Sequence, residues 1–125
     1  MINKEKTLKM KNWAVVGATD KKNKTGYKIY KKLKNHNYNV HPINPKLDNI
    51  DGDKCYPDLS SVPGEIDVVD MVVNPEIGIK VMEDIKDEGI EYVWLQPGTR
   101  SVEIRQFARK NNIKLIENCI LVTLG

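Results

Sequence analysis

The hydrophobic residues form two kinds of pattern that alternate along the chain. Short continuous apolar runs that end at glycine, proline or a polar residue are typical of buried parallel strands. Such runs lie at residues 12–18, 38–43, 66–73, 91–95 and 114–117. Between several of them, apolar residues recur at helical spacing. This spacing predicts amphipathic helices at residues 25–35, 75–88 and 101–111.

The other segments carry weaker signals. Residues 1–11 are polar and rich in lysine, which indicates a loose arm or a short helix. Residues 46–65 are rich in turn formers and leave room for a short edge strand near Lys54–Tyr56 and a helical turn at Asp58–Val62. The tail from Cys119 to Leu124 is apolar enough to pack on the domain.

Strands that alternate with helices predict a parallel sheet with helices on both faces. Right-handed crossovers favour an α/β, Rossmann-like, doubly wound and mostly parallel sheet, and residues 1–125 suit a single domain. In such sheets a ligand binds beyond the carboxyl ends of the strands. Candidate functional residues are therefore those in the loops that follow the strands.

The composition is that of an ordinary globular protein. Of the 125 residues, 40% are hydrophobic and 30% are charged, and no apolar run is long enough to span a bilayer. The basic N-terminus lacks the apolar core of a signal peptide, so a cytoplasmic location is the default expectation. Cys55 and Cys119 lie far apart in a chain without an export signal, and we interpret them as free thiols.

The net charge of +3 conceals a strong asymmetry. Residues 1–46 contain twelve lysines and two acidic residues, a balance of +10. Residues 47–125 contain eight basic and fifteen acidic residues, a balance of −7. This asymmetry predicts that the first portion faces an anion, although lysines that only solvate the surface explain it equally well.

The loop after the first strand has the features of a phosphate site. The loop and the start of the next helix contain Gly17, Ala18, Thr19, Asp20, Lys21, Lys22, Lys24, Gly26 and Tyr27. Gly17 permits a tight turn, Gly26 permits close backbone approach, and the N–H groups of the first helical turn attract an anion. Glycine and solvated lysines are common in any such loop, but the position after the first strand favours a phosphate.

The loop after the second strand, Asn44-Pro45-Lys46, bears on the identity of the nucleotide. NAD sites usually have an acidic residue near this position, and none lies between Tyr38 and Lys46. Lys46 suits a phosphorylated ribose, which coenzyme A and NADP both contain. The alternative interpretation is an ordinary surface lysine.

The third candidate loop is Val73-Asn74-Pro75. It has a structural explanation beside the functional one, because Asn74 can cap a helix that Pro75 opens. That helix places Ile77, Val81, Met82 and Ile85 on one face, which we expect to pack inward.

The fourth candidate loop is Gln96-Pro97-Gly98. A turn explains the proline and the glycine, whereas Gln96 at the end of an apolar strand can present its amide to a ligand. Elsewhere, His36 and His41 have no cysteine or carboxylate at ligand spacing, so no metal site is predicted. We interpret Cys119 as a buried structural thiol, with a redox-active thiol as the alternative, and it is the one plausible nucleophile for an enzyme that acts on CoA thioesters. We expect a binding protein rather than an enzyme.

With these loops assembled, the chain resembles the small stand-alone CoA-binding domain family. The same domain type begins the succinyl-CoA synthetase α subunit and is found in ADP-forming acyl-CoA synthetases. The resemblance covers nearly all of residues 12–122 and rests on the ordered segments VVGATD, VHPINPK, YPDLSSVP, IDVVDMVVNPE, VWLQPG and ENC.

The resemblance implies roles for the loops. It implies that the 17–20 turn and Gly26 hold the nucleotide, and that Lys46 meets an anionic part of coenzyme A. It also implies that Val73-Asn74-Pro75 and Gln96-Pro97-Gly98 flank the pantetheine. Many relatives have Leu-Gly after the glutamine, where this chain has Pro97-Gly98. The phosphorylated histidine of the synthetases belongs to a further domain, so the resemblance carries no ligase activity to residues 1–125.

The first hypothesis is a non-catalytic protein that binds coenzyme A or an acyl-CoA, as a monomer or a homodimer. The alternative is an NADP-binding oxidoreductase or redox-sensing module, for which 125 residues leave little room for a substrate domain. A nucleic-acid partner is disfavoured because the chain has one phenylalanine, two tryptophans and five tyrosines, and several of these fall in core positions. No membrane partner is expected.

Overall fold

A computed structural model describes residues 2–125, and its centre is a parallel sheet of five strands. The strands are β1 (Asn12–Val16), β2 (Asn39–Ile43), β5 (Val68–Met71), β6 (Tyr92–Leu95) and β7 (Lys114–Ile116). Their order in the sheet is β2-β1-β5-β6-β7, and each neighbouring pair is parallel. The predicted Rossmann-like α/β fold is confirmed.

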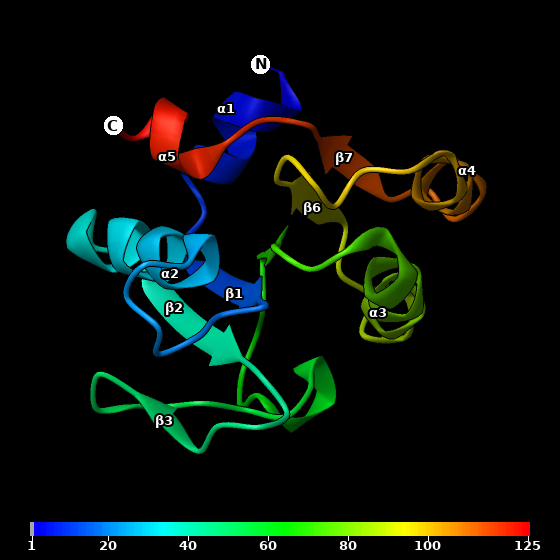
Figure 1. Ribbon diagram of the computed structural model, residues 1–125. Helices are drawn as coiled ribbons and strands as arrows, with labels where there is room; N and C mark the ends of the chain where they lie inside the picture. Colours follow the sequence, from blue (N-terminus) through cyan, green and yellow to red (C-terminus); the bar gives the residue numbers. More distant parts are fainter. Residues whose placement is uncertain (1) are drawn as a thin grey trace.

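Helices cover both faces of the sheet (Figure 1). The elements on one face are α1 (Asn3–Leu8), α2 (Thr25–Asn35) and α5 (Ile120–Thr123), and those on the other are α3 (Pro75–Asp87) and α4 (Val102–Lys110). Helix α2 has the predicted bounds because Ile29, Tyr30 and Leu33 recur at helical spacing and are completely buried. None of the helices in the described part of the chain is long and apolar enough to cross a membrane.

The order of the strands creates a switch point between β1 and β5. The chain passes from β1 through α2 to β2, and it then returns to the opposite side of β1 to form β5. The helices that follow β1 and β5 therefore lie on opposite faces of the sheet. Val16 is in register with both Ile43 and Met71, so these three strands end at the same edge. This edge is where a ligand binds in open α/β sheets.

The predicted edge strand near Lys54–Tyr56 is mostly replaced by a hairpin. Strands β3 (Asn49–Ile50) and β4 (Asp53–Lys54) pair antiparallel around a turn in which Asp51 and Gly52 both have positive φ. Of the predicted strand, Tyr56 alone pairs with β2, through a single parallel bridge to Ile43. A short 3₁₀ turn, η1 (Leu59–Ser61), follows where a helical turn was predicted.

The inward face of α3 differs from the prediction. Met82 and Ile85 are completely buried, as expected, but Ile77 is 49% exposed and Val81 is only partly buried. Gly78 occupies the tight contact instead, since a Cβ there would lie 3.0 Å from Ile104 and 3.1 Å from the sulfur of Met71. The helix is thus rotated so that Ile77 and Val81 face the edge of the sheet where the strands end.

Both ends of the chain pack on the α2 face of the sheet (Figure 1). Residues 3–8 form the short helix that was one of two expectations for the arm, and Thr7 accepts a 2.9 Å hydrogen bond from the indole of Trp94. The tail packs as predicted, with Ile120 completely buried. Cys55 and Cys119 are free thiols.

Candidate functional site

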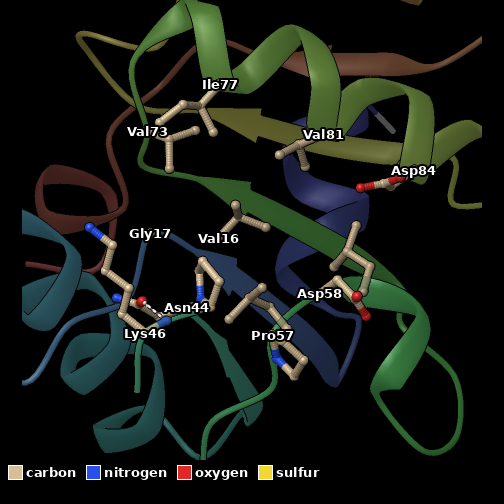
Figure 2. A pocket seen from close by; sticks show the side chains of 13 residues that line it. Val16, Gly17, Asn44, Lys46, Pro57, Asp58, Val73, Ile77, Val81 and Asp84 are labelled. Carbon is tan, nitrogen blue, oxygen red and sulfur yellow. Dashed lines mark hydrogen bonds between the residues drawn. The ribbon is translucent and has the colours of Figure 1, made fainter. Parts of the chain in front are cut away.

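A cleft of about 380 Å³ lies at the carboxyl ends of β1, β2 and β5. Figure 2 shows its walls, which come from the loops after these strands, from α3 and from the segment around η1. The lining residues are Val16, Gly17, Ile43, Asn44, Pro45, Lys46, Pro57, Asp58, Leu59, Val73, Ile77, Val81 and Asp84. Most of these side chains are apolar, and the charged ones lie at the two ends. A slot of this kind suits a flat apolar group with polar substituents.

Two glycines shape the turn after β1. Gly17 has φ +97°, and a Cβ at this position would lie 2.3 Å from the carbonyl oxygen of Val72. A Cβ on Gly26 would lie 2.1 Å from the carbonyl oxygen of Gly17. Gly26 therefore lets the backbone at the start of α2 approach the backbone of the turn after β1. Both glycines are required by the packing of the chain itself, and this packing aims the start of α2 at the edge of the sheet.

The N-terminus of α2 has features of an anion site. Its N-cap is Lys24, which makes no side-chain capping hydrogen bond, and the first turn contains no acidic residue. Lys21, Lys22 and Lys24 are exposed and form no ion pair within residues 2–125. The N–H groups of the first turn and these lysines together favour a phosphate.

Asn44 joins the loops after β1 and β2. Its Nδ2 donates a 2.8 Å hydrogen bond to the carbonyl oxygen of Ala18, and its Oδ1 accepts a 2.9 Å hydrogen bond from the backbone N–H of Lys46. Both amide atoms of Asn44 are thus engaged within the protein. The bonds fix the loop so that Lys46 lies at one end of the cleft (Figure 2), without an ion-pair partner in the described chain.

The structure brings five of the predicted site residues together in the cleft. These are Gly17, Asn44, Pro45, Lys46 and Val73. Ala18, Thr19, Asp20, Lys24 and Gly26 belong to the adjoining turn and to the start of α2. The site predicted at the first two loops is thus one continuous region at the edge of the sheet.

Other predicted site residues lie elsewhere or serve the fold. Tyr27 lines a separate hollow on the outer side of α2, which Lys22 of the preceding turn also borders, and its hydroxyl donates a 2.6 Å hydrogen bond to Asp51. Asn74 accepts a 3.0 Å hydrogen bond from the N–H of Ile77 and thereby caps α3, which Pro75 opens. Pro97 and Gly98 are exposed in the turn after β6.

Gln96 is completely buried, so its amide does not face the cleft. Its Nε2 donates a 2.7 Å hydrogen bond to Asp70, and its Oε1 accepts a 3.1 Å hydrogen bond from the N–H of Ile120. The sequence analysis expected that this amide can be presented to a ligand, whereas in the structure both of its polar atoms have partners inside the protein. The side chain connects the centre of the sheet to the start of α5 because an amide at this depth needs internal partners.

Eight lining residues were not predicted from the sequence. Val16, Ile43, Pro57, Asp58, Leu59, Ile77, Val81 and Asp84 all line the cleft. Val16 and Ile43 are the last residues of their strands, so the same strand-end rule could have found them. The residues of α3 and of the η1 segment are near the cleft only through tertiary packing.

The charges of the cleft are separated along its length. Lys46 lies at one end, and Asp58 and Asp84 lie at the other (Figure 2). Hydrogen bonds from Ser61 and Ser60 lower the pKa of Asp58 below its ordinary value. Partial burial is the largest cause that raises the pKa of Asp84, and the negative charges of Asp58, Asp87 and Glu83 raise it further. No cation neutralises these two carboxylates within residues 2–125.

Comparison with known proteins identifies the family. The model of the family described as "CoA binding domain" matches residues 11–125. The chain belongs to this CoA-binding domain family. An ADP-forming acetate–CoA ligase of Methanocaldococcus jannaschii is 35% identical over 119 residues, which cover 88% of this chain and 17% of the ligase. The chain thus spans about a sixth of the length of that enzyme.

Other proteins that are similar to this chain have a length close to its own. The uncharacterized protein YneT of Bacillus subtilis is 28% identical over 120 residues, which cover 95% of this chain and 89% of YneT. A solved structure of a conserved hypothetical protein from Pyrococcus furiosus superimposes with a TM-score of 0.87 at 36% identity, covering 91% of this chain and 99% of that one. The proteins that this chain resembles therefore include both long ligases and chains of similar length.

Proposed function

We propose that this chain is a non-catalytic binding protein for coenzyme A or an acyl-CoA. The observation that carries the proposal is the cleft at the ends of β1, β2 and β5, with Lys46 at one end, in a chain of the CoA-binding domain family. The apolar walls accept the base, and Lys46 meets the 3′-phosphate of the ribose. The N-terminus of α2 and the lysines before it hold the diphosphate.

The chemistry of the cleft supports binding rather than catalysis. Its titratable side chains are Lys46, Asp58 and Asp84, and no serine, threonine, cysteine or histidine is among its lining residues. No serine, threonine or cysteine nucleophile paired with a histidine base is therefore present among the lining residues of this site. The relatives of similar length fit a protein in which this domain acts without a ligase attached.

The first prediction concerns the ligand and Lys46. Coenzyme A should raise the melting temperature of the protein, because a ligand that binds only the folded state stabilises it. Lys46→Ala should weaken binding of coenzyme A by about tenfold, the loss expected for one charge-assisted contact. The same substitution should barely change the affinity for dephospho-CoA, which lacks the ribose 3′-phosphate. Isothermal titration calorimetry of both ligands with both proteins measures these differences.

Lys80→Ala is the matched control, since Lys80 is an exposed lysine of α3 outside the cleft. It should leave both affinities unchanged. A rise in melting temperature with NADP but none with coenzyme A would overturn the proposal. Equal losses for coenzyme A and dephospho-CoA in Lys46→Ala would show that Lys46 does not contact the 3′-phosphate.

A further inference from the structure

A buried carboxyl group on β5 lies close to the start of α5. Asp70 faces the α2 side of the sheet, because Val69 and Met71, its neighbours on the strand, face the other side. Its side chain is completely buried, and Oδ2 has no hydrogen-bond partner within residues 2–125. A buried polar atom without a partner calls for an explanation. The proposed ligand site gives none, because Asp70 does not line the cleft.

One amide group separates Asp70 from α5. Gln96 Nε2 donates a 2.7 Å hydrogen bond to Oδ1 of Asp70, and Gln96 Oε1 accepts a 3.1 Å hydrogen bond from the backbone N–H of Ile120. Both bonds belong to the same planar amide, so the two partners lie on either side of it. A change of charge at Asp70 is therefore transmitted through a single side chain to the first residue of the helix.

The segment that begins at α5 is weakly anchored. Ile120 is the buried residue of this four-residue helix, and Leu121 and Leu124 are only partly buried against the same apolar cluster. The N-cap residue, Cys119, is also only partly buried and makes no side-chain capping bond. The N–H of Ile120 therefore depends on Gln96 for its partner. Short elements with few buried contacts open at a lower free energy than the core.

We propose that Asp70, Gln96 and α5 form a pH-dependent latch, in which loss of the Asp70 proton favours opening of residues 119–125 away from the sheet. In the closed form the carboxylate would have one hydrogen bond and no ion-pair partner among the described residues. Opening lets water reach the carboxylate and stabilise its charge. The inference does not depend on the proposed function.

The other ionisable groups near the latch do not titrate between pH 5 and pH 7. Glu117 precedes the segment and pairs with Arg105 and Arg100. The hydrogen bond from Arg105 lowers the pKa of Glu117, so this carboxylate stays charged in that range. The other titratable side chains buried in the apolar cluster are Tyr30, Tyr92 and Cys55. Tyrosine and cysteine are neutral at these pH values.

The two histidines titrate in this range, but they lie elsewhere. His36 is exposed after the end of α2. His41 packs edge-on against Tyr56, which belongs to the cluster on the opposite face of the sheet. Asp70 is thus the group whose ionisation reaches α5 directly.

Amide exchange measured by NMR on the full chain at pH 5, 6 and 7 tests the latch. After correction for intrinsic exchange, protection of the Ile120, Thr123 and Leu124 amides should fall by about tenfold from pH 5 to pH 6. The reason is that Asp70 holds its proton up to about pH 7 in the closed form and loses it near pH 3.8 when exposed. Asp70→Asn should show no such fall. Glu117→Gln, which removes the other carboxyl near the segment, should keep the wild-type fall.

A second variant tests the link without changing Asp70. Gln96→Met removes the acceptor for the Ile120 N–H, so at pH 5 the protection of the Ile120 amide should be at least about tenfold lower than in the wild type. Unchanged protection in this variant would overturn the latch. So would wild-type protection that does not vary with pH, or a fall that persists in Asp70→Asn. Protection of Ile120 equal to that of Val15 in β1 would mean that the segment opens only when the whole fold unfolds, which also contradicts the proposal.

Discussion

Asp70 is a carboxylic acid at the centre of the sheet. Its side chain is completely buried on β5, where Oδ1 accepts the bond from Gln96 and Oδ2 has no partner within residues 2–125. Burial disfavours the charged form and raises the pKa of Asp70 to about 7, an effect that the Gln96 bond partly offsets. A group of this kind makes the stability of the fold depend on pH.

We expect the stability contributed by Asp70 to be lost as the pH rises. The unfolded chain releases this proton near pH 3.8 and the folded protein near pH 7, so the folded state binds more protons between these values. The free energy of unfolding should fall across this window by at most about 1.4 kcal/mol per pH unit from this group. Urea denaturation of the wild type and of Asp70→Asn at several pH values measures the difference.

The comparison isolates one residue because other titrating groups contribute equally to both proteins. Asp70→Asn should lack the part of the slope that belongs to Asp70. Asp48→Asn, which changes an exposed carboxyl, should keep the wild-type slope. Parallel stability profiles for the wild type and Asp70→Asn would contradict the assignment.

At the scale of elements, Asn74 at the start of α3 has two possible roles, as a helix cap or as a ligand contact. Two substitutions of Asn74 distinguish these roles. Asn74→Ala removes the bond to the N–H of Ile77 and should lower the free energy of unfolding by about 1 kcal/mol. Asn74→Ser retains an N-cap and should preserve stability. Because Asn74 does not line the cleft, we expect Asn74→Ser to bind coenzyme A within about twofold of the wild-type affinity.

Denaturation and calorimetry on the same two variants measure the two effects separately. Ser101→Ala is the control for stability, since Ser101 caps α4 through the N–H of Ile104 and lies outside the cleft. It should cost about as much stability as Asn74→Ala. A large loss of affinity in Asn74→Ser at unchanged stability would instead assign Asn74 to the ligand.

The elements show where sequence patterns are informative. Helix α2 could be predicted to the residue because the apolar residues Ile29, Tyr30 and Leu33 recur at helical spacing and are completely buried. The structure of residues 49–56, next to β2, could not be predicted in this way. Asp51-Gly52 forms the turn of the β3–β4 hairpin, and Tyr56 pairs with β2 through one bridge. There, turn chemistry outweighed the weak strand signal of residues 54–56.

Some residues of the candidate site could be predicted from the sequence, and others are placed by tertiary packing. The strand-end rule located the loops that carry Gly17, Asn44 and Lys46, because that rule depends only on topology. The wall formed by Ile77 and Val81 depends on the rotation of α3, which the tight contact at Gly78 sets. Gln96 is buried rather than exposed because Asp70 and the start of α5 lie within its reach.

On the scale of the whole molecule, the charge asymmetry along the chain becomes an asymmetry in space. The lysines of residues 1–46 lie mainly on α1, on the turn after β1 and on α2. A second hollow, which shares Asp58 and Asp84 with the cleft, is lined by Asp58, Ser60, Asp84, Asp87 and Glu88. The basic region therefore adjoins the proposed phosphate site, and the acidic region adjoins the end of the cleft that Asp58 and Asp84 line.

This arrangement predicts that salt slows the capture of an anionic nucleotide. Raising NaCl from about 50 to about 500 mM shortens the screening length severalfold, so the association rate of coenzyme A should fall by at least about threefold. Stopped-flow measurements give this rate apart from the dissociation rate, which short-range contacts control. Replacement of Lys21, Lys22 and Lys24 by glutamine should lower the rate at low salt and flatten its salt dependence.

A replacement of Lys80, Lys86 and Lys110 by glutamine is the control, because these lysines lie on α3 and α4, and it should leave the salt dependence unchanged. An association rate that is the same at both salt concentrations would mean that the basic face of residues 1–46 does not guide the ligand to the cleft.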